Sequence, residues 1–280
     1  MIAQSISTII HVYHGHAALI SNAVARQLML EVNRRSFSKK QPCVKQIKAI
    51  IDHAVHEIYG NNAHVQLQGS VGKGTGIEEV SDLDFFVMLA KDISQVTRAE
   101  RITLMNKILA SNSYSYSASL REHRILLIPP HDNSLPSVDI VFERFKIVKA
   151  RDEPNSNLSE SHEAQIVTKF LKFLPRPSPG PHSLLGGYTN LNRPGSQLER
   201  FVLLVEQELA SNGNRQNDLT GSKGVSIILQ TCLEKISQMM PLTPNQQNSL
   251  EESEMMMNDQ WSHAAKKCLN KLERLSKSDC

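Results

Sequence analysis

The sequence lacks the patterns that define several large classes of protein. Its four cysteines, Cys43, Cys232, Cys268 and Cys280, are scattered without CxxC spacing, which argues against both a disulfide scaffold and a zinc site. The longest apolar runs are far shorter than a membrane span, and no Lys or Arg precedes Arg26, so neither a membrane partner nor a secretory signal is expected. We therefore expect a cytoplasmic protein, with the nucleus as the alternative compartment.

Charge and histidine patterns narrow the possibilities further. The net charge is only +3 over 280 residues, so the sequence has no global polycationic signature for nucleic acid, although a local basic groove stays open. The eleven histidines form no HExxH array, and a histidine-metal enzyme is not expected. With 40% hydrophobic residues the composition is that of an ordinary globular protein, long enough for one large domain or two lobes.

One stretch, GSVGKGTGIEEVSDLDFFVML from Gly69 to Leu89, carries a chemical signature. A Gly-Ser turn precedes Asp82 and Asp84, which stand at the head of an apolar run predicted to be a buried strand. Alternate strand residues share a face, so the two carboxylates project side by side and raise each other's pKa. Mg²⁺ resolves this repulsion because it prefers oxygen ligands and takes substrate phosphates as its other ligands. The stretch therefore indicates metal-dependent phosphoryl chemistry.

A third carboxylate, Asp139, stands alone in a later apolar segment that is predicted to be a strand over 138–145. A carboxylate inside an apolar strand is costly unless it is paired or bound to a metal. Two explanations stay open: Asp139 forms an ion pair with Arg124 or Arg144, or it is a third metal ligand. Asp132 competes for the ligand role, but it lies in a turn beside two prolines.

Hydrophobic periodicity predicts the remaining organisation of the chain. Helices are predicted over residues 2–35, 44–59, 94–110, 162–174, 196–211, 222–239 and 258–277. Strands are predicted over 64–68, 85–89, 124–128 and 138–145, the last two in a hairpin-like arrangement that favours antiparallel pairing. We expect two lobes: a palm domain over 42–150, and a helical lobe made of 1–41 and 151–280, which includes a Pro/Gly-rich connector over 175–195.

The motif GSVGKGT at 69–75, followed by SDLD at 81–84, resembles the 2′-5′-oligoadenylate synthetases, in which GSSGKGT precedes SDAD. These enzymes belong to the polymerase-β-like nucleotidyltransferase superfamily, whose other oligonucleotide-signal synthases share a looser GS…GT…SDxD pattern. The resemblance covers about Leu67 to Leu89, and Asp139. It implies an α+β fold with a mixed or antiparallel palm sheet and a helical lobe. It also implies an enzyme that transfers a nucleotide from an NTP, with ATP as the expected donor, to a hydroxyl and releases pyrophosphate.

The same resemblance assigns roles to individual residues. Asp82, Asp84 and Asp139 are expected to be both catalytic and metal-binding, holding two Mg²⁺ ions, and Asp139 would help to deprotonate the attacking hydroxyl. Gly69 and Ser70 are expected to bind the NTP, because a glycine lets the backbone approach a triphosphate and the serine hydroxyl donates to phosphate oxygens.

Two lysines are also predicted to bind the NTP. Lys73 would neutralise phosphate charge or contact an activating duplex; an exposed loop lysine is the alternative. Lys169 lies one turn from Lys172 on the predicted helix after Asp139, where this superfamily often supplies a lysine to the triphosphate; a solvated helix face is the alternative. The sequence around Lys73 does not satisfy the P-loop pattern, because Gly74 follows the lysine.

The expected partners are an NTP and RNA, the latter as a double-stranded activator or as an acceptor. Three rival activities share the same metal site: an RNA terminal nucleotidyltransferase, a cyclic-dinucleotide-type synthase, and a transferase that modifies a protein or small molecule. A non-catalytic NTP- or RNA-binding protein with the same fold is the rival from another functional class. The metal-site motifs do not separate these functions, since the acceptor is chosen elsewhere in the fold.

Overall fold

The computed structural model describes residues 20–38, 40–77, 81–111, 114–121, 124–130, 135–144, 161–174, 195–211, 219–238 and 259–278. The chain divides into two compact units, one within Glu31–Phe173 and Arg193–Leu204, the other within Met1–Leu30, Leu174–Asn192 and Val205–Cys280. The predicted start of the first helix, over 2–19, and most of the Pro/Gly-rich connector lie outside the described residues. The palm boundaries at 42–150 stay a prediction.

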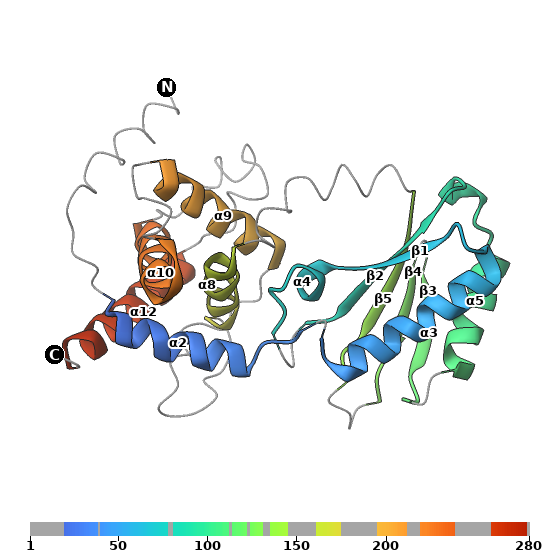
Figure 1. The fold of residues 1–280 in the computed structure, drawn as a ribbon, viewed down its shortest axis with the longest axis horizontal. Helices are drawn as coiled ribbons and strands as arrows, with labels where there is room; N and C mark the ends of the chain where they lie inside the picture. Colours follow the sequence, from blue (N-terminus) through green and yellow to red (C-terminus); the bar gives the residue numbers. More distant parts are fainter. Residues whose placement is uncertain are drawn as a thin grey trace. The chain divides into compact units, whose positions relative to one another are not determined.

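The described secondary structure follows the predicted order of elements (Figure 1). The helices are α2 (Asn22–Arg34), α3 (Pro42–Tyr59), α4 (Gly69–Gly72), α5 (Arg98–Ser111), α8 (His162–Phe173), α9 (Gly195–Ser211), α10 (Gly221–Gln238) and α12 (Asp259–Ser278), with a 3-10 turn, η2, at Ile93–Gln95. The strands are β1 (His64–Gln68), β2 (Leu83–Leu89), β3 (Ser117–Arg121), β4 (Arg124–Ile128) and β5 (Val138–Arg144).

The five strands form one mixed sheet in the order β1-β2-β5-β4-β3. β2 and β5 are parallel, and the other neighbours are antiparallel. The predicted α+β fold and the antiparallel pairing of 124–128 with 138–145 are confirmed. The edge strand β3 was not predicted, because its sequence, SASLR, has neither β-branched residues nor a run of apolar ones.

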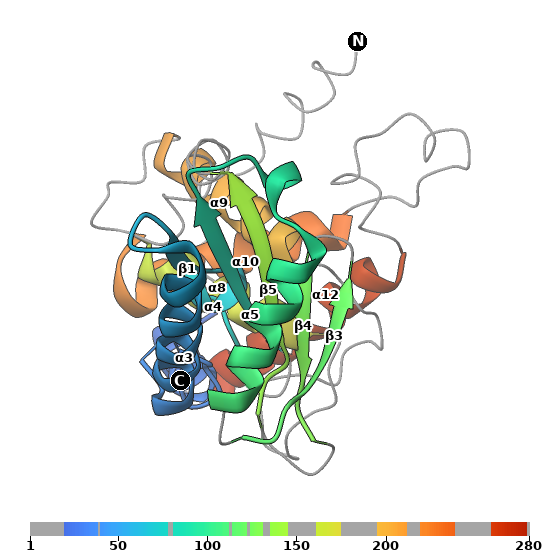
Figure 2. The same ribbon diagram turned by 90° about the vertical axis from the view of Figure 1, so that its right-hand side faces the viewer.

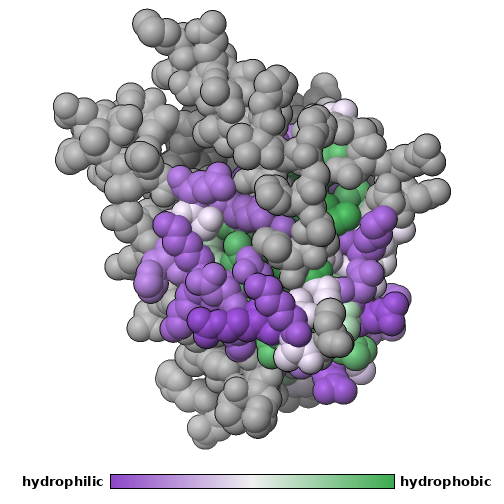
Figure 3. All heavy atoms as spheres, turned by 90° about the vertical axis from the view of Figure 1, so that its left-hand side faces the viewer, coloured by the Kyte–Doolittle hydropathy of each residue, from purple (hydrophilic) through white to green (hydrophobic). Residues whose placement is uncertain are grey.

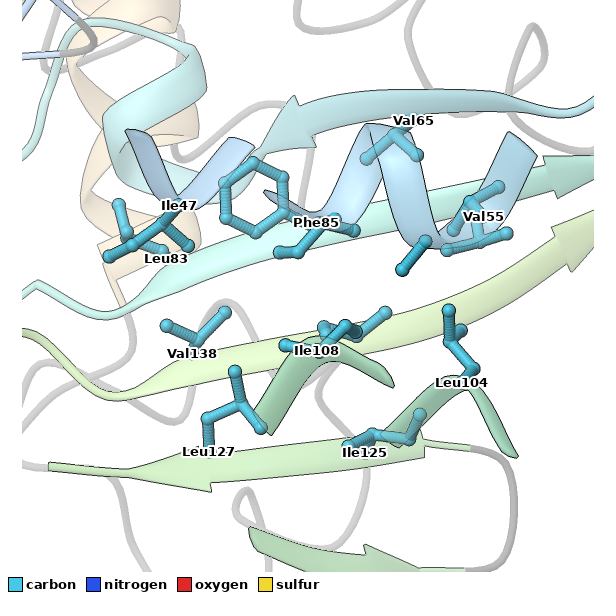
Figure 4. Packing of buried hydrophobic residues seen from close by; sticks show 14 of the residues in the cluster. Ile47, Val55, Val65, Leu83, Phe85, Leu104, Ile108, Ile125, Leu127 and Val138 are labelled. Atoms are coloured by element: carbon cyan, nitrogen blue, oxygen red, sulfur yellow. The ribbon is translucent and has the colours of Figure 1, made fainter. Parts of the chain in front are cut away.

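The core of this unit lies on one face of the sheet. Along β2, buried and half-buried residues alternate, and Leu83, Phe85 and Val87 are fully buried. Helices α3 and α5 cover this face (Figure 2) and contribute apolar stripes that include Ile47 and Ile108. Figure 4 shows these side chains pointing toward one another between helices and strands. The other face of β2 is therefore free to carry polar groups.

Two details at the start of β2 differ from the prediction. The Gly-Ser segment at 69–70 is the beginning of a short helix, α4, rather than a turn. The strand begins at Leu83, so Asp82 precedes it and only Asp84 lies within it. The apolar run is also buried on one face alone, because residues such as Phe86 are only half-buried.

In the other unit, α10 packs against α12. The apolar face of α12 is buried, and its exposed positions are polar or charged. Hydrophilic side chains accordingly dominate the described surface in Figure 3. Among the described residues, Cys43, Cys232 and Cys268 form no disulfide bond. Within the described part of the chain, no helix is both long and apolar enough to cross a bilayer.

The one-sided core makes a testable distinction between adjacent phenylalanines. Phe85 is 0% exposed, whereas Phe86 is half-buried on the opposite face. We expect Phe85→Ala to lower the free energy of unfolding by about 3–5 kcal/mol, because it leaves a cavity in the core, and Phe86→Ala to cost clearly less. Urea denaturation followed by circular dichroism measures both. Equal losses at the two positions would contradict the one-sided core.

Candidate active site

Asp84 is held close to the backbone of Gly69. The antiparallel pairing of β1 with β2 places Gln68 opposite Asp84, and α4 begins at the next residue. Gly69 has φ +60°, and a Cβ at this position would lie 1.7 Å from Oδ2 of Asp84. Glycine is therefore required here both by its left-handed conformation and by the approach of the carboxylate.

The parallel pairing of β2 with β5 places Asp84 directly opposite Asp139. Asp82 lies two residues before Asp84, and its charge also acts on that carboxyl. Burial, followed by the charges of Asp82 and Asp139, raises the pKa of Asp84 to about 6; the charge of Lys73 opposes the shift. The structure thus brings the three predicted carboxylates within electrostatic range of one another.

Asp139 has one satisfied and one unsatisfied carboxylate oxygen. Its Oδ2 accepts a hydrogen bond of 2.9 Å from Nη1 of Arg124, the ion pair that was one of the two explanations for this residue. Its Oδ1 is buried and has no hydrogen-bond partner among the described residues. A buried carboxylate oxygen without a partner is unusual and indicates a missing proton donor or cation. The Arg124 pair therefore leaves one oxygen of Asp139 for a further ligand. The side chains of Arg144 and Asp132 lie outside the described residues.

The three carboxylates have the oxygen chemistry that Mg²⁺ prefers. Among the described residues, no group of three or more His, Cys, Asp or Glu side chains is arranged to hold a metal ion as it stands. The chemistry nevertheless fits, because the unpaired Oδ1 of Asp139 and the raised pKa of Asp84 both reveal a deficit of positive charge. Asp82, Asp84 and Asp139 stay the predicted ligands of Mg²⁺.

Ser70 takes part in closing the loop that precedes β2. Its Oγ donates to Oγ of Ser81 over 3.1 Å, and Oγ of Ser81 accepts from the backbone N–H of Ile77 over 2.9 Å. The carbonyl oxygen of Ser70 accepts from the backbone N–H of Thr75 at 2.8 Å. These bonds fix the start of α4 beside Asp84.

The predicted NTP-binding lysines are not on solvated surfaces. Lys73 has a side-chain exposure of 19%, and its Nζ lies 3.2 Å from Oε2 of Glu199. Lys169 is 8% exposed, and its Nζ donates to Oγ of Ser36 over 2.9 Å. Burial, and to a lesser degree the charge of Lys172, lowers the pKa of Lys169 to about 8. Lys169 is thus buried and Lys73 half-buried, and both belong to the unit that contains the three aspartates.

Glu199 is a component of the site that the sequence analysis did not identify. It lies on α9, is 2% exposed, and contacts Lys73, Lys172 and Thr75. Burial would raise the pKa of Glu199, but the charges of Lys172 and Lys73 outweigh it, and the pKa is lowered. The available signal was a charged residue on the apolar stripe of the predicted helix over 196–211.

No protein-family model matches the sequence, and no curated protein sequence matches it significantly. Solved structures do share the fold. A structure of Cid1, an RNA terminal uridylyl transferase, aligns with a TM-score of 0.56 and 13% identity over 79% of this chain and 74% of that chain. The Cid1 poly(U) polymerase with MgGTP bound aligns with a TM-score of 0.54 and 13% identity over 91% of this chain and 92% of that chain.

A third match is the polymerase core of TRAMP, an RNA surveillance complex, with a TM-score of 0.50 and 13% identity over 91% of this chain and 86% of that chain. These proteins are polymerase-β-like nucleotidyltransferases, and this chain has their fold. At this level of identity the likeness establishes the fold alone. None of the three is an oligoadenylate synthetase, so the closer resemblance expected from the motif is not established.

The raised pKa of Asp84 predicts a pH-dependent stability. Between its ordinary value of 3.8 and about 6, the folded protein binds the Asp84 proton more tightly than the unfolded chain, so this group lowers stability as pH rises through that window. Asp84→Asn removes the buried charge. We expect the variant to gain about 1–2 kcal/mol at pH 8, after allowance for partial exposure, and little at pH 4.

Thermal unfolding with a metal chelator present at both pH values measures this difference. The matched control is Asp52→Asn, which removes a carboxylate paired with Lys48 on α3. An equal gain of Asp84→Asn at pH 8 and pH 4 would show that the buried charge of Asp84, with its repulsion by Asp82 and Asp139, is not the cause.

Proposed function

We propose that the protein is a magnesium-dependent nucleotidyltransferase that adds nucleotides to the 3′ end of RNA. The observation that carries this proposal is the β2–β5 register, which sets Asp84 opposite Asp139 and beside the backbone of Gly69, in a fold shared with RNA terminal transferases. The cluster of buried lysines supports a polyphosphate substrate, because several cations in one place favour a multiply charged anion.

The residues divide the chemistry among them. Asp82, Asp84 and Asp139 hold the metal, whose charge would stabilise the attacking and leaving oxygens of in-line transfer. Asp139 is also assigned to help deprotonate the attacking hydroxyl, and no described group bonds to its Oδ1. Lys73 and Lys169 bind the triphosphate, and the Ser70 hydroxyl would donate to it from the start of α4 after turning away from Ser81.

An oligoadenylate-synthetase-like activity on ATP is the second candidate, and the GSVGKGT and SDLD motifs favour it. The two candidates share the metal site and differ in the acceptor and the linkage. RNA terminal transfer is preferred because a Cid1 structure aligns over more than nine tenths of both chains. Double-stranded RNA as an activator belongs to the second candidate only.

The deciding experiment supplies purified protein with Mg²⁺, each NTP in turn and a 5′-labelled single-stranded RNA. We expect the RNA to grow at its 3′ end, and the rate to fall by about 10³-fold or more in Asp84→Asn, because a metal ligand is lost. Gel electrophoresis of the labelled RNA measures extension. Asp52→Asn is the matched control and keeps wild-type activity.

Parallel reactions without the single-stranded RNA, with and without double-stranded RNA, test the second candidate. ATP oligomers that resist a 3′-5′-specific nuclease would replace the proposal by a synthetase-like activity. The absence of any product under all of these conditions would favour a non-catalytic binder with the same fold.

Metal binding has a readout that does not depend on turnover. We expect Mg²⁺ to raise the melting temperature of the wild type, because the ion relieves repulsion among the aspartates and binds only the folded state. Asp84→Asn should show a much smaller rise, while Asp52→Asn should respond like the wild type. Differential scanning fluorimetry over a Mg²⁺ titration measures the shift. Equal responses of the wild type and Asp84→Asn would contradict the assigned site.

A further inference from the structure

A single buried carboxylate, that of Glu199, connects Lys73, which contacts the triphosphate in the proposed reaction, to Lys172 and Thr75. Oε2 of Glu199 lies 3.2 Å from Nζ of Lys73, and Oε1 lies 3.1 Å from Nζ of Lys172. The hydroxyl of Thr75 donates to the same Oε1. One side chain of α9 therefore contacts both the loop after α4 and helix α8.

Lys172 reinforces the same connection. Besides its bond to Glu199, its Nζ donates to the carbonyl oxygen of Thr75 over 3.0 Å and to the hydroxyl of Thr75 over 3.1 Å. An ammonium group has three protons, and these three acceptors account for all of them. Lys172 is thus fully committed within the protein, and its bonds hold Thr75 at the end of the loop.

Lys73 differs from Lys172 in one respect. It has only the Glu199 carboxylate as a hydrogen-bond partner among the described contacts, it is the more exposed of the two, and its charge acts on the carboxyl of Asp84. The positive charge of Lys73 therefore acts both on Glu199 and on Asp84, one of the predicted metal ligands. Two protons of the Lys73 ammonium are left for another acceptor.

Charge explains why Glu199 has to be ionised in this position. Burial, and to a lesser degree the charge of Lys73, lowers the pKa of Lys172, so the two ammonium groups repel each other. Both are largely removed from water. Without an anion between them, one of the two would move outward to solvent, and the loop would move with it. With Glu199 in place, the trio keeps one net positive charge, which an incoming polyphosphate can use.

We propose that Glu199 is a positioning residue of the NTP site: it holds Lys73 in place to contact the triphosphate, and it fixes the 69–75 loop against α8 through Thr75 and Lys172. The inference rests on the proposed nucleotidyltransferase function. Glu199 does not touch the substrate itself, and its effect on the reaction is exerted through Lys73 and the loop.

The expected consequence is a loss of NTP binding without a loss of the metal site. Glu199→Gln keeps the shape of the side chain and removes its charge, so Lys73 loses its ionic partner. We expect kcat/KM to fall by about 10²-fold, mainly through a higher KM for the NTP, since a displacement of about 1 Å is enough for a loss of this size. Asp84→Asn, by contrast, should lower kcat.

A double-mutant cycle separates positioning from a purely structural role. If Glu199 acts through Lys73, the pair Lys73→Gln and Glu199→Gln should be strongly non-additive, and the double variant should be little worse than Lys73→Gln alone. Additive losses in kcat/KM would overturn the inference. Glu208→Gln is the matched control. Glu208 lies on α9, like Glu199, but its carboxylate pairs with Lys235 of α10, so the substitution should leave KM unchanged.

Binding of Mg·UTP and Mg·ATP, followed by isothermal titration calorimetry, adds a readout that does not need turnover. Circular dichroism and the Mg²⁺-induced melting shift establish that each variant is folded. If Glu199→Gln does not fold, Glu199→Asp keeps the charge but shortens its reach, and the same rise in KM and in the dissociation constant is expected. Unchanged KM and binding in a folded variant at position 199 would overturn the inference while leaving the proposed function intact. A wild type that neither transfers nor binds an NTP would overturn both.

Discussion

The parallel pairing of β2 with β5 is the constraint on which the site depends. Because this register sets Asp84 opposite Asp139, two carboxylates face each other in a partly buried place, and Asp82 adds a third charge nearby. The protein groups around these carboxylates do not fully compensate their negative charge. It leaves one oxygen of Asp139 unpaired and holds Asp84 against the backbone of Gly69. This repulsion lowers the stability of the protein at neutral pH, and the proposed Mg²⁺ would relieve it.

The lysines form the complement of this acidic group. Lys73, Lys169 and Lys172 are all largely buried, and each has a polar partner within the same unit. Burial of three lysines is expensive for a protein that binds nothing, because each charge loses water. The arrangement suits a substrate that carries its own metal and several negative charges. Glu199 limits the excess of positive charge and keeps two of the lysines close together.

The sequence motif and the fold favour different candidate functions. The GSVGKGT and SDLD motifs resemble the oligoadenylate synthetases, whereas the solved structures that share the fold include RNA terminal transferases. The predicted metal site would be common to both, since the same carboxylates can serve any hydroxyl acceptor. The choice between them therefore depends on the groups that bind the acceptor, and fold alone does not determine function.

The sequence by itself predicted most of the elements in their order and the residues of the candidate metal site. Strand β1 at 64–68 and the carboxylates Asp82 and Asp84 follow from local periodicity and spacing, which depend only on neighbouring residues. Tertiary structure alone decided that Arg124 pairs with Asp139 and that Glu199 joins Lys73, which is 126 residues away. Periodicity states which face of a helix is buried, but it does not state which distant charge lies opposite. Long-range pairing of buried charges is therefore fixed by the packing of strands and helices, and it became visible only in the folded chain.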